Sequence, residues 1–107
     1  MDGYTEVMNP KVTFEREKVA ELCRRYGVAE LALFGSVLRD DFRAGSDVDV
    51  LVSFSPDAHP SLLDLAELRE DLRDLFGREV DLVERAGLRN PFRQRAILST
   101  AEVVYAS

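Results

Sequence analysis

The spacing of apolar residues along the chain predicts two amphipathic helices. Over residues 13–26 and again over residues 61–76, apolar side chains recur every three or four positions, as they do on one face of a helix. Thr13 and Ser61 are suitable N-caps, and Gly27 and Gly77 are suitable C-terminal stops. Val19, Leu22, Cys23 and Tyr26 are expected to face the core, and the helical period of the second segment is followed by Leu62, Leu65, Leu68 or Arg69, Leu72 and Phe76.

Shorter apolar runs predict β-strands at residues 31–34, 48–54 and 79–83. The second run alternates strictly, because valines at 48, 50 and 52 alternate with Asp47, Asp49 and Leu51. Successive side chains of a strand point to opposite faces, so the valines are expected on one face and both aspartates on the other.

The C-terminal part is expected to hold one more helix and one more short element. Asn90 is a good N-cap and Pro91 suits the first turn, so a helix should run to about residue 98. Residues 103–105 are expected to form a final short strand or a docked tail.

This order of elements predicts an α/β or α+β fold, in which helices pack on a small mixed sheet. The chain of 107 residues has the length of one domain. Residues 1–9 show no clear pattern and are expected to be a flexible leader, which leaves residues 10–107 as the folded domain.

Composition narrows the possible functions. The formal net charge is −6, and the longest basic cluster, residues 89–95, holds three arginines, so direct binding of nucleic acid is not expected. No apolar run is long enough for a membrane span, and the first residues do not form a signal peptide. A single cysteine, Cys23, excludes a disulfide within the chain and suits a reducing cytoplasm.

Three aspartates provide the candidate chemistry. Asp47 and Asp49 are two residues apart in a predicted strand, so both carboxylates should project from the same face. Asp81 lies in the next predicted strand and could bring a third carboxylate to that face. Carboxylates this close repel one another unless a cation is present, and Mg²⁺ prefers such oxygen ligands together with substrate phosphates.

Gly35 and Ser36 follow the first predicted strand in a tight turn. Glycine lets backbone N–H groups approach a phosphate closely, and the serine hydroxyl can donate a further hydrogen bond. Taken alone, a Gly-Ser pair is usually a turn, and a lone Asp-Val-Asp is often a solvated strand edge. Their combination with Asp81 favours a site for a nucleoside triphosphate and metal.

The same residues carry a resemblance to a known family. Gly35-Ser36, Asp47-Val48-Asp49 and the later Asp81 resemble the signature of the DNA polymerase β-like nucleotidyltransferase superfamily. The short chain resembles its minimal branch, which is typified by the antitoxins of HEPN/MNT toxin–antitoxin pairs. The resemblance covers about residues 31–105.

The resemblance implies the nucleotidyltransferase fold and a role for each matched residue. Asp47 and Asp49 would ligate two Mg²⁺ ions, and Asp81 would ligate one and help to take the proton from the acceptor hydroxyl. The implied contacts to the ATP substrate come from Gly35, Ser36, Arg39 and Ser46. The implied reaction is transfer of AMP from ATP to a tyrosine of a partner HEPN ribonuclease, which silences that toxin.

Two alternatives remain open from the sequence. A binding-only antitoxin would cover its partner without catalysis, using Phe92, Ile97, Val104 and Tyr105 as a surface, although such residues are more often core. An adenylyltransferase for a small molecule such as an aminoglycoside is the less favoured alternative, because the chain is short for building a second wall around such a substrate.

Overall fold

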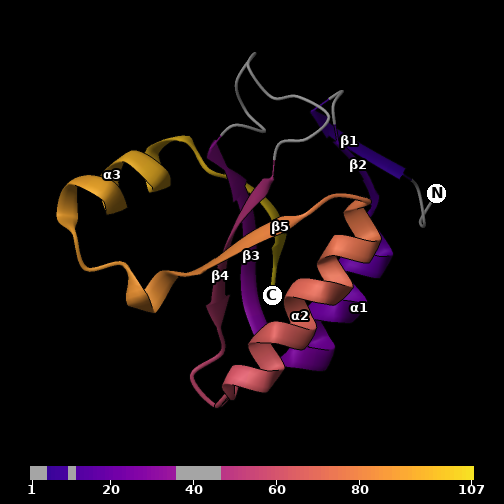
Figure 1. Cartoon of the computed structure of the whole chain (residues 1–107), viewed down its shortest axis with the longest axis horizontal. Helices are drawn as coiled ribbons and strands as arrows, with labels where there is room; N and C mark the ends of the chain where they lie inside the picture. Colours follow the sequence, from indigo (N-terminus) through magenta and orange to yellow (C-terminus); the bar gives the residue numbers. More distant parts are fainter. Residues whose placement is uncertain (1–4, 10–11, 36–46) are drawn as a thin grey trace.

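The computed structural model describes residues 5–9, 12–35 and 47–107 (Figure 1). Its elements, in chain order, are strands β1 (Thr5–Asn9) and β2 (Val12–Glu15), helix α1 (Arg16–Tyr26), strands β3 (Val28–Phe34) and β4 (Val48–Phe54), helix α2 (Leu62–Phe76), strand β5 (Val80–Glu84), the 3-10 turn η2 (Arg85–Gly87), helix α3 (Pro91–Thr100) and strand β6 (Glu102–Ala106).

The central sheet has four strands in the order β5-β4-β3-β6. β4 and β5 run parallel, whereas β3 is antiparallel to both β4 and β6, so the sheet is mixed, as predicted. β1 and β2 form a separate antiparallel pair. Because β4 and β5 are parallel, their first residues meet at one edge of the sheet, where β3 ends.

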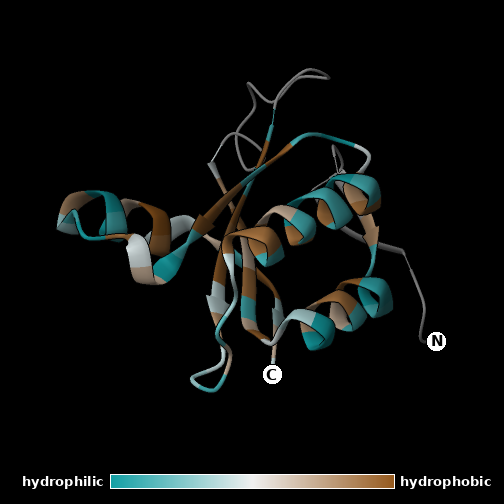
Figure 2. Cartoon of the chain, turned by 60° about the horizontal axis from the view of Figure 1, so that its bottom comes forward, coloured by the Kyte–Doolittle hydropathy of each residue, from teal (hydrophilic) through white to brown (hydrophobic). Residues whose placement is uncertain are grey.

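Both faces of the central sheet are covered, and β4 contributes to each core. Its valines at 48, 50 and 52 are fully buried with Leu68 and Leu72 of α2 and Val19 of α1. Leu51 points to the opposite face, where it packs with Phe34 and with Ile97 of α3. Figure 1 shows α1 and α2 side by side on one side of the sheet and α3 on the other, and Figure 2 shows the apolar strands between them.

Helix α2 has the ends that the sequence predicts. The Ser61 hydroxyl oxygen accepts a hydrogen bond from the Asp64 backbone N–H at 3.1 Å, and the Asp64 carboxylate accepts one from the Ser61 N–H at 2.9 Å. This reciprocal capping box satisfies two amides that otherwise lack partners. The helix ends at Gly77, and α1 ends in the same way at Gly27.

The expected start of the first helix is wrong. Thr13 lies in strand β2, and α1 begins at Arg16 with Glu15 as its N-cap residue. The reason is non-local, because residues 12–15 pair with Thr5–Asn9. That strand, β1, lies within the stretch 1–9 that was expected to be a flexible leader.

Other boundaries differ by a few residues. β3 begins at Val28 rather than at residue 31, and β5 spans Val80–Glu84 rather than residues 79–83. α3 extends to Thr100, and the final element is a strand, β6, rather than a docked tail. Cys23 is 1% exposed, which confirms it as a core residue, and burial raises the pKa of its thiol to about 12.

Candidate active site

The pairing of β4 with β5 brings two of the predicted aspartates together. In this parallel pair Asp49 lies opposite Asp81, and across the antiparallel β3–β4 pair Asp49 lies opposite Phe34. Neighbouring strands are about 4.8 Å apart, so the two aspartates are adjacent on one face. Alternation puts this face on the side of Leu51 and Val83, which is the side covered by α3. Asp47 immediately precedes β4.

Gly35 is in direct contact with the Asp49 carboxylate. Its backbone has φ of +76°, in the left-handed region that side chains disfavour. A Cβ atom built on Gly35 would overlap Asp49 Oδ2 and would lie 3.0 Å from Asp49 Cγ and 3.3 Å from its Cβ. The Asp49 carboxylate therefore occupies the space that a side chain at position 35 would fill.

This contact is a role for Gly35 that the sequence pattern does not reveal. The sequence indicates a glycine that lets a phosphate approach, whereas the contact with Asp49 depends on how β3 and β4 pair. The two roles are compatible, because one concerns the backbone N–H groups of the turn and the other the Cα hydrogens of Gly35.

The aspartates differ in exposure. Asp47 and Asp81 are exposed, and Asp49 is half-buried against Gly35. Among residues 5–9, 12–35 and 47–107, no three His, Cys, Asp or Glu side chains converge as a metal-binding group. The adjacent positions of Asp49 and Asp81 on one sheet face nevertheless suit Mg²⁺, which takes one or two carboxylates from the protein and completes its shell with water and substrate phosphates.

Three of the predicted nucleotide contacts cannot be placed relative to these aspartates. Ser36, Arg39 and Ser46 lie outside the described residues. Gly35, Asp47, Asp49 and Asp81 are thus the predicted site residues that the structure locates, at the edge where β3 ends and β4 and β5 begin.

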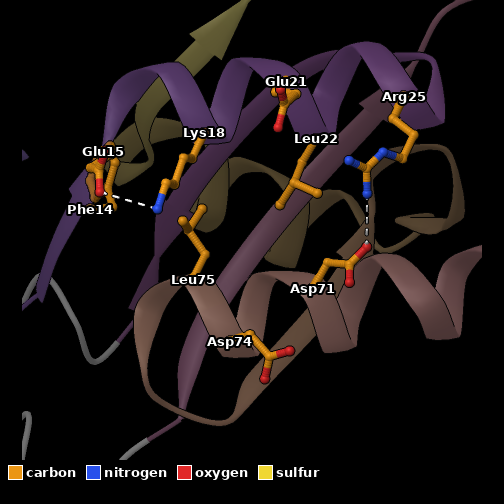
Figure 3. A pocket seen from close by; sticks show the side chains of 9 residues that line it. All are labelled: Phe14, Glu15, Lys18, Glu21, Leu22, Arg25, Asp71, Asp74 and Leu75. Atoms are coloured by element: carbon orange, nitrogen blue, oxygen red, sulfur yellow. Dashed lines mark ion pairs between the residues drawn. The ribbon is translucent and has the colours of Figure 1, made fainter. Parts of the chain in front are cut away.

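A hollow of about 490 Å³ lies between α1 and α2, on the other side of the sheet from Asp49 (Figure 3). Leu22 and Leu75 point into it, and two ion pairs lie at its rim. Lys18 Nζ lies 3.3 Å from Glu15 Oε1, and Arg25 Nη1 lies 3.8 Å from Asp71 Oδ2. Its position on the other side of the sheet distinguishes this hollow from the aspartate site.

Asp71 also holds the two helices together. The Tyr26 hydroxyl donates a hydrogen bond of 2.6 Å to Asp71 Oδ2. Burial, then this hydrogen bond and the carboxylate charge, raise the pKa of Tyr26 to about 12. The pair links the end of α1 to the middle of α2 and has no contact with the catalytic candidates.

The surface expected for a binding-only antitoxin is divided between core and solvent. Ile97 and Val104 are 7% and 6% exposed and belong to the core, and Tyr105 is half-buried. Phe92, in contrast, is 82% exposed. The four residues therefore do not form one surface, and Phe92 alone retains the predicted exposure.

A comparison with protein families decides the class of protein. Residues 15–104 match the model of the nucleotidyltransferase domain. The chain belongs to the nucleotidyltransferase family. It is an enzyme of the minimal nucleotidyltransferase type, related to the MntA protein adenylyltransferases. The resemblance predicted from the sequence is thereby confirmed.

Individual relatives agree with this assignment. The protein adenylyltransferase MntA of Thermococcus cleftensis is 42% identical over 85 residues, which cover 79% of this chain and 81% of that protein. A solved structure named as a candidate minimal nucleotidyltransferase is 40% identical, with a TM-score of 0.66 over 81% of this chain and 86% of that one. The mixed sheet and its helices match that nucleotidyltransferase structure.

Two toxin–antitoxin structures share the fold at lower identity. One contains AMP-PNP and superposes with a TM-score of 0.67 at 19% identity, covering 86% of this chain and 73% of that chain. The other is a tri-AMPylated HEPN toxin of Shewanella oneidensis in complex with its MNT antitoxin. Its TM-score is 0.60 at 18% identity, covering 86% of this chain and 70% of that chain.

Within the described part of this nucleotidyltransferase, no helix is long and apolar enough to cross a membrane.

Proposed function

We propose that this nucleotidyltransferase transfers AMP from ATP to a tyrosine hydroxyl of a HEPN-domain toxin and thereby acts as its antitoxin. The observation that carries the proposal is the alignment of Asp49 with Asp81, with the Asp49 carboxylate held against Gly35. Two comparisons support the choice of substrate: the 42% identical relative is named a protein adenylyltransferase, and a structure of the same fold contains an AMPylated HEPN toxin.

The proposed reaction is a substitution at the α-phosphorus of ATP. The acceptor oxygen forms a bond to this phosphorus, the bond from phosphorus to the oxygen that bridges to the β-phosphate breaks, and pyrophosphate leaves. The hydroxyl proton passes to a carboxylate. Asp81 suits this role because its exposed side chain can be reached by an acceptor that arrives from outside the protein.

Asp49 suits a different role, that of a fixed ligand. Its half-buried carboxylate is confined by Gly35, and a confined carboxylate needs no reorganisation when a cation and a phosphate arrive. Asp49 and Asp81 would hold Mg²⁺, which would neutralise the triphosphate and draw electrons from the α-phosphorus. Asp47 is the third proposed ligand, although the three carboxylates do not converge in this structure. Gly35 and Ser36, with Arg39 and Ser46, are the proposed contacts to the triphosphate.

The direct test is intact mass spectrometry of a HEPN-domain protein from the same organism, after incubation with this protein, ATP and Mg²⁺. We expect the HEPN protein to gain AMP units, and fragment spectra should locate them on tyrosine. The Asp49→Asn/Asp81→Asn variant should transfer none. Asp57→Asn, which changes an exposed aspartate of the β4–α2 loop, is the matched control and should transfer normally.

Two outcomes would contradict the proposal. Equal AMP gain with the wild-type protein and the Asp49→Asn/Asp81→Asn variant would exclude catalysis by these carboxylates. Neutralisation of the toxin without ATP, retained in the same variant, would favour the binding-only antitoxin instead.

A further inference from the structure

Positive charge in this acidic protein is concentrated around α3. Residues 85–101 contain four arginines and no aspartate or glutamate, whereas the rest of the chain has ten basic and twenty acidic residues. Arg89, Arg93 and Arg95 are exposed, and none of their guanidinium groups forms an ion pair with another described residue. The segment is thus a local cationic surface on a molecule that is otherwise strongly negative.

An exposed aromatic side chain lies within this surface. Phe92 is 82% exposed, although α3 buries Ile97 against the sheet. Phe92 and Ile97 are five residues apart, which corresponds to a rotation of about 140° around the helix axis. Because Ile97 faces the sheet, Phe92 lies on the outward side of the helix. Ala96 and Ser99 follow Phe92 at i+4 and i+7 and share that side, which Arg95 and Arg93 flank.

The small residues leave this outward stripe flat and weakly polar. The Ser99 and Thr100 hydroxyls each donate a hydrogen bond of 3.1 Å to the Ala96 carbonyl oxygen, so their donors are already used within the helix. A partner can therefore cover the stripe without leaving these hydroxyls unsatisfied. Figure 1 shows α3 projecting on the side of the sheet away from α1 and α2.

We propose that the outward side of α3, made of Phe92, Arg93, Arg95, Ala96 and Ser99, is the docking surface for the acceptor protein. The complementary surface on that protein is acidic and contains an apolar pocket for the Phe92 ring. This inference rests on the proposed function, because it takes the AMP acceptor as the occupant. It goes further by naming the residues that bind the acceptor and the chemistry that they recognise.

The residue types favour a protein partner. Exposed aromatic and arginine side chains are enriched among the residues that dominate binding energies in protein interfaces. A polyanion such as RNA is disfavoured, because three arginines offer few phosphate contacts and the rest of the molecule repels negative charge. An acidic protein surface of limited size can meet the arginines and avoid the acidic remainder.

The location is also suited to catalysis. α3 packs on the face of the sheet that carries Leu51 and Val83, and alternation along β4 and β5 places Asp49 and Asp81 on the same face. An acceptor bound to α3 therefore lies on the side of the sheet from which the aspartates project. The surface would raise the local concentration of the acceptor hydroxyl without contacting the nucleotide.

The test is the binding of this protein to a HEPN-domain protein from the same organism, measured by isothermal calorimetry without ATP. We expect Phe92→Ala to weaken binding about tenfold to a hundredfold. Arg93→Glu/Arg95→Glu should weaken it by a similar factor at low ionic strength and less at high salt. In transfer assays both variants should raise KM for the acceptor protein and leave kcat unchanged.

Matched controls distinguish docking from general effects of charge and apolar surface. Leu62 at the start of α2 is 86% exposed, so Leu62→Ala removes a comparable apolar side chain elsewhere. Arg24→Glu/Arg69→Glu makes the same charge change on α1 and α2. Both controls should bind like the wild type, and thermal unfolding should show that all four variants fold.

Several results would overturn the inference. Unchanged affinity in the α3 variants, with AMP transfer intact, would exclude this surface while leaving the proposed function standing. If the wild-type protein did not bind the HEPN protein, the HEPN protein would be excluded as the partner that covers the α3 surface. Binding of a mixed-sequence single-stranded RNA that is lost in Arg93→Glu/Arg95→Glu would assign the surface to nucleic acid. Absence of AMP transfer with α3-dependent binding would instead contradict only the proposed function.

Discussion

Replacing Gly35 with alanine tests whether the contact with Asp49 matters for catalysis. The new Cβ would overlap Asp49 Oδ2 and lie 3.0 Å from Asp49 Cγ, so the carboxylate must turn away. Movement of a catalytic group by about 1 Å can cost about 100-fold in rate. We therefore expect Gly35→Ala to lower AMP transfer by about that factor or more.

The same substitution also strains the backbone. An L-residue at a φ of +76° costs about 1–2 kcal/mol relative to glycine. For a domain of this size, each kcal/mol corresponds to a fall of about 4–8 °C in the melting temperature. The loss of activity must therefore be separated from the loss of stability. This requires a second variant that strains the backbone in the same way but places no Cβ against another side chain.

Gly77→Ala provides that control. Gly77 has φ of +70°, and a Cβ there meets no atom within 4 Å. Both variants should lose similar stability in calorimetric melts, but only Gly35→Ala should lose AMP transfer when assayed well below either melting temperature. Equal activity in the two variants would refute the reasoning, because it would show that the Asp49 position beside Gly35 is not the catalytic one.

Three further predictions follow from the described residues. Mg²⁺ should raise the melting temperature of the wild type, and it should raise that of Asp81→Asn much less, because one of the two adjacent carboxylates is removed. Melting curves recorded with and without chelator measure this difference. Ser61→Ala should lower the unfolding free energy by about 1 kcal/mol in urea titrations, because it removes the α2 cap. Cys23 and Tyr26 have their pKa values raised to about 12, so they favour the folded state while protonated. Their contribution is fully present below their unfolded pKa values, about 9 and 10, and should be lost as the pH rises towards 12. Urea titrations at successive alkaline pH values should show this loss, and Tyr26→Phe should show less of it. If the unfolding free energy fell equally with pH in both proteins, Tyr26 would not be the source of the loss.

Elements with strong local signals were predictable from the sequence. β4 was predicted at its observed bounds because apolar residues recur at every second position from Val48 to Phe54. α2 was predicted from its cap to Gly77, because the Ser61 cap, the helical period and the terminal glycine lie within one segment. The helix start at Asn90-Pro91 is another local signal, and the Asn90 side chain accepts hydrogen bonds from the N–H groups of Phe92 and Arg93.

Elements that depend on distant partners were predicted less well. Thr13 resembles an N-cap, but residues 12–15 pair with β1, and no local pattern announces that pairing. β3 extends back to Val28 because it pairs with β4 opposite Phe54. In both places the backbone hydrogen bonds of the strand are satisfied by another segment, so the bounds follow from tertiary structure.

The sequence by itself determined the chemistry of this protein: which residues are acids, that Asp49 lies on the strand face opposite the valines, and which family the pattern resembles. The predicted sharing of that face by Asp47 did not follow, because β4 begins at Val48 and Asp47 lies just before it. The tertiary structure decided the arrangement. The register between β4 and β5 places Asp49 opposite Asp81, and the pairing of β3 with β4 places the Asp49 carboxylate in the space that Gly35 leaves. Packing of α3 on the sheet likewise buries Ile97 and exposes Phe92. Side-chain alternation is a local property of the backbone, whereas register and burial depend on residues far apart in the chain.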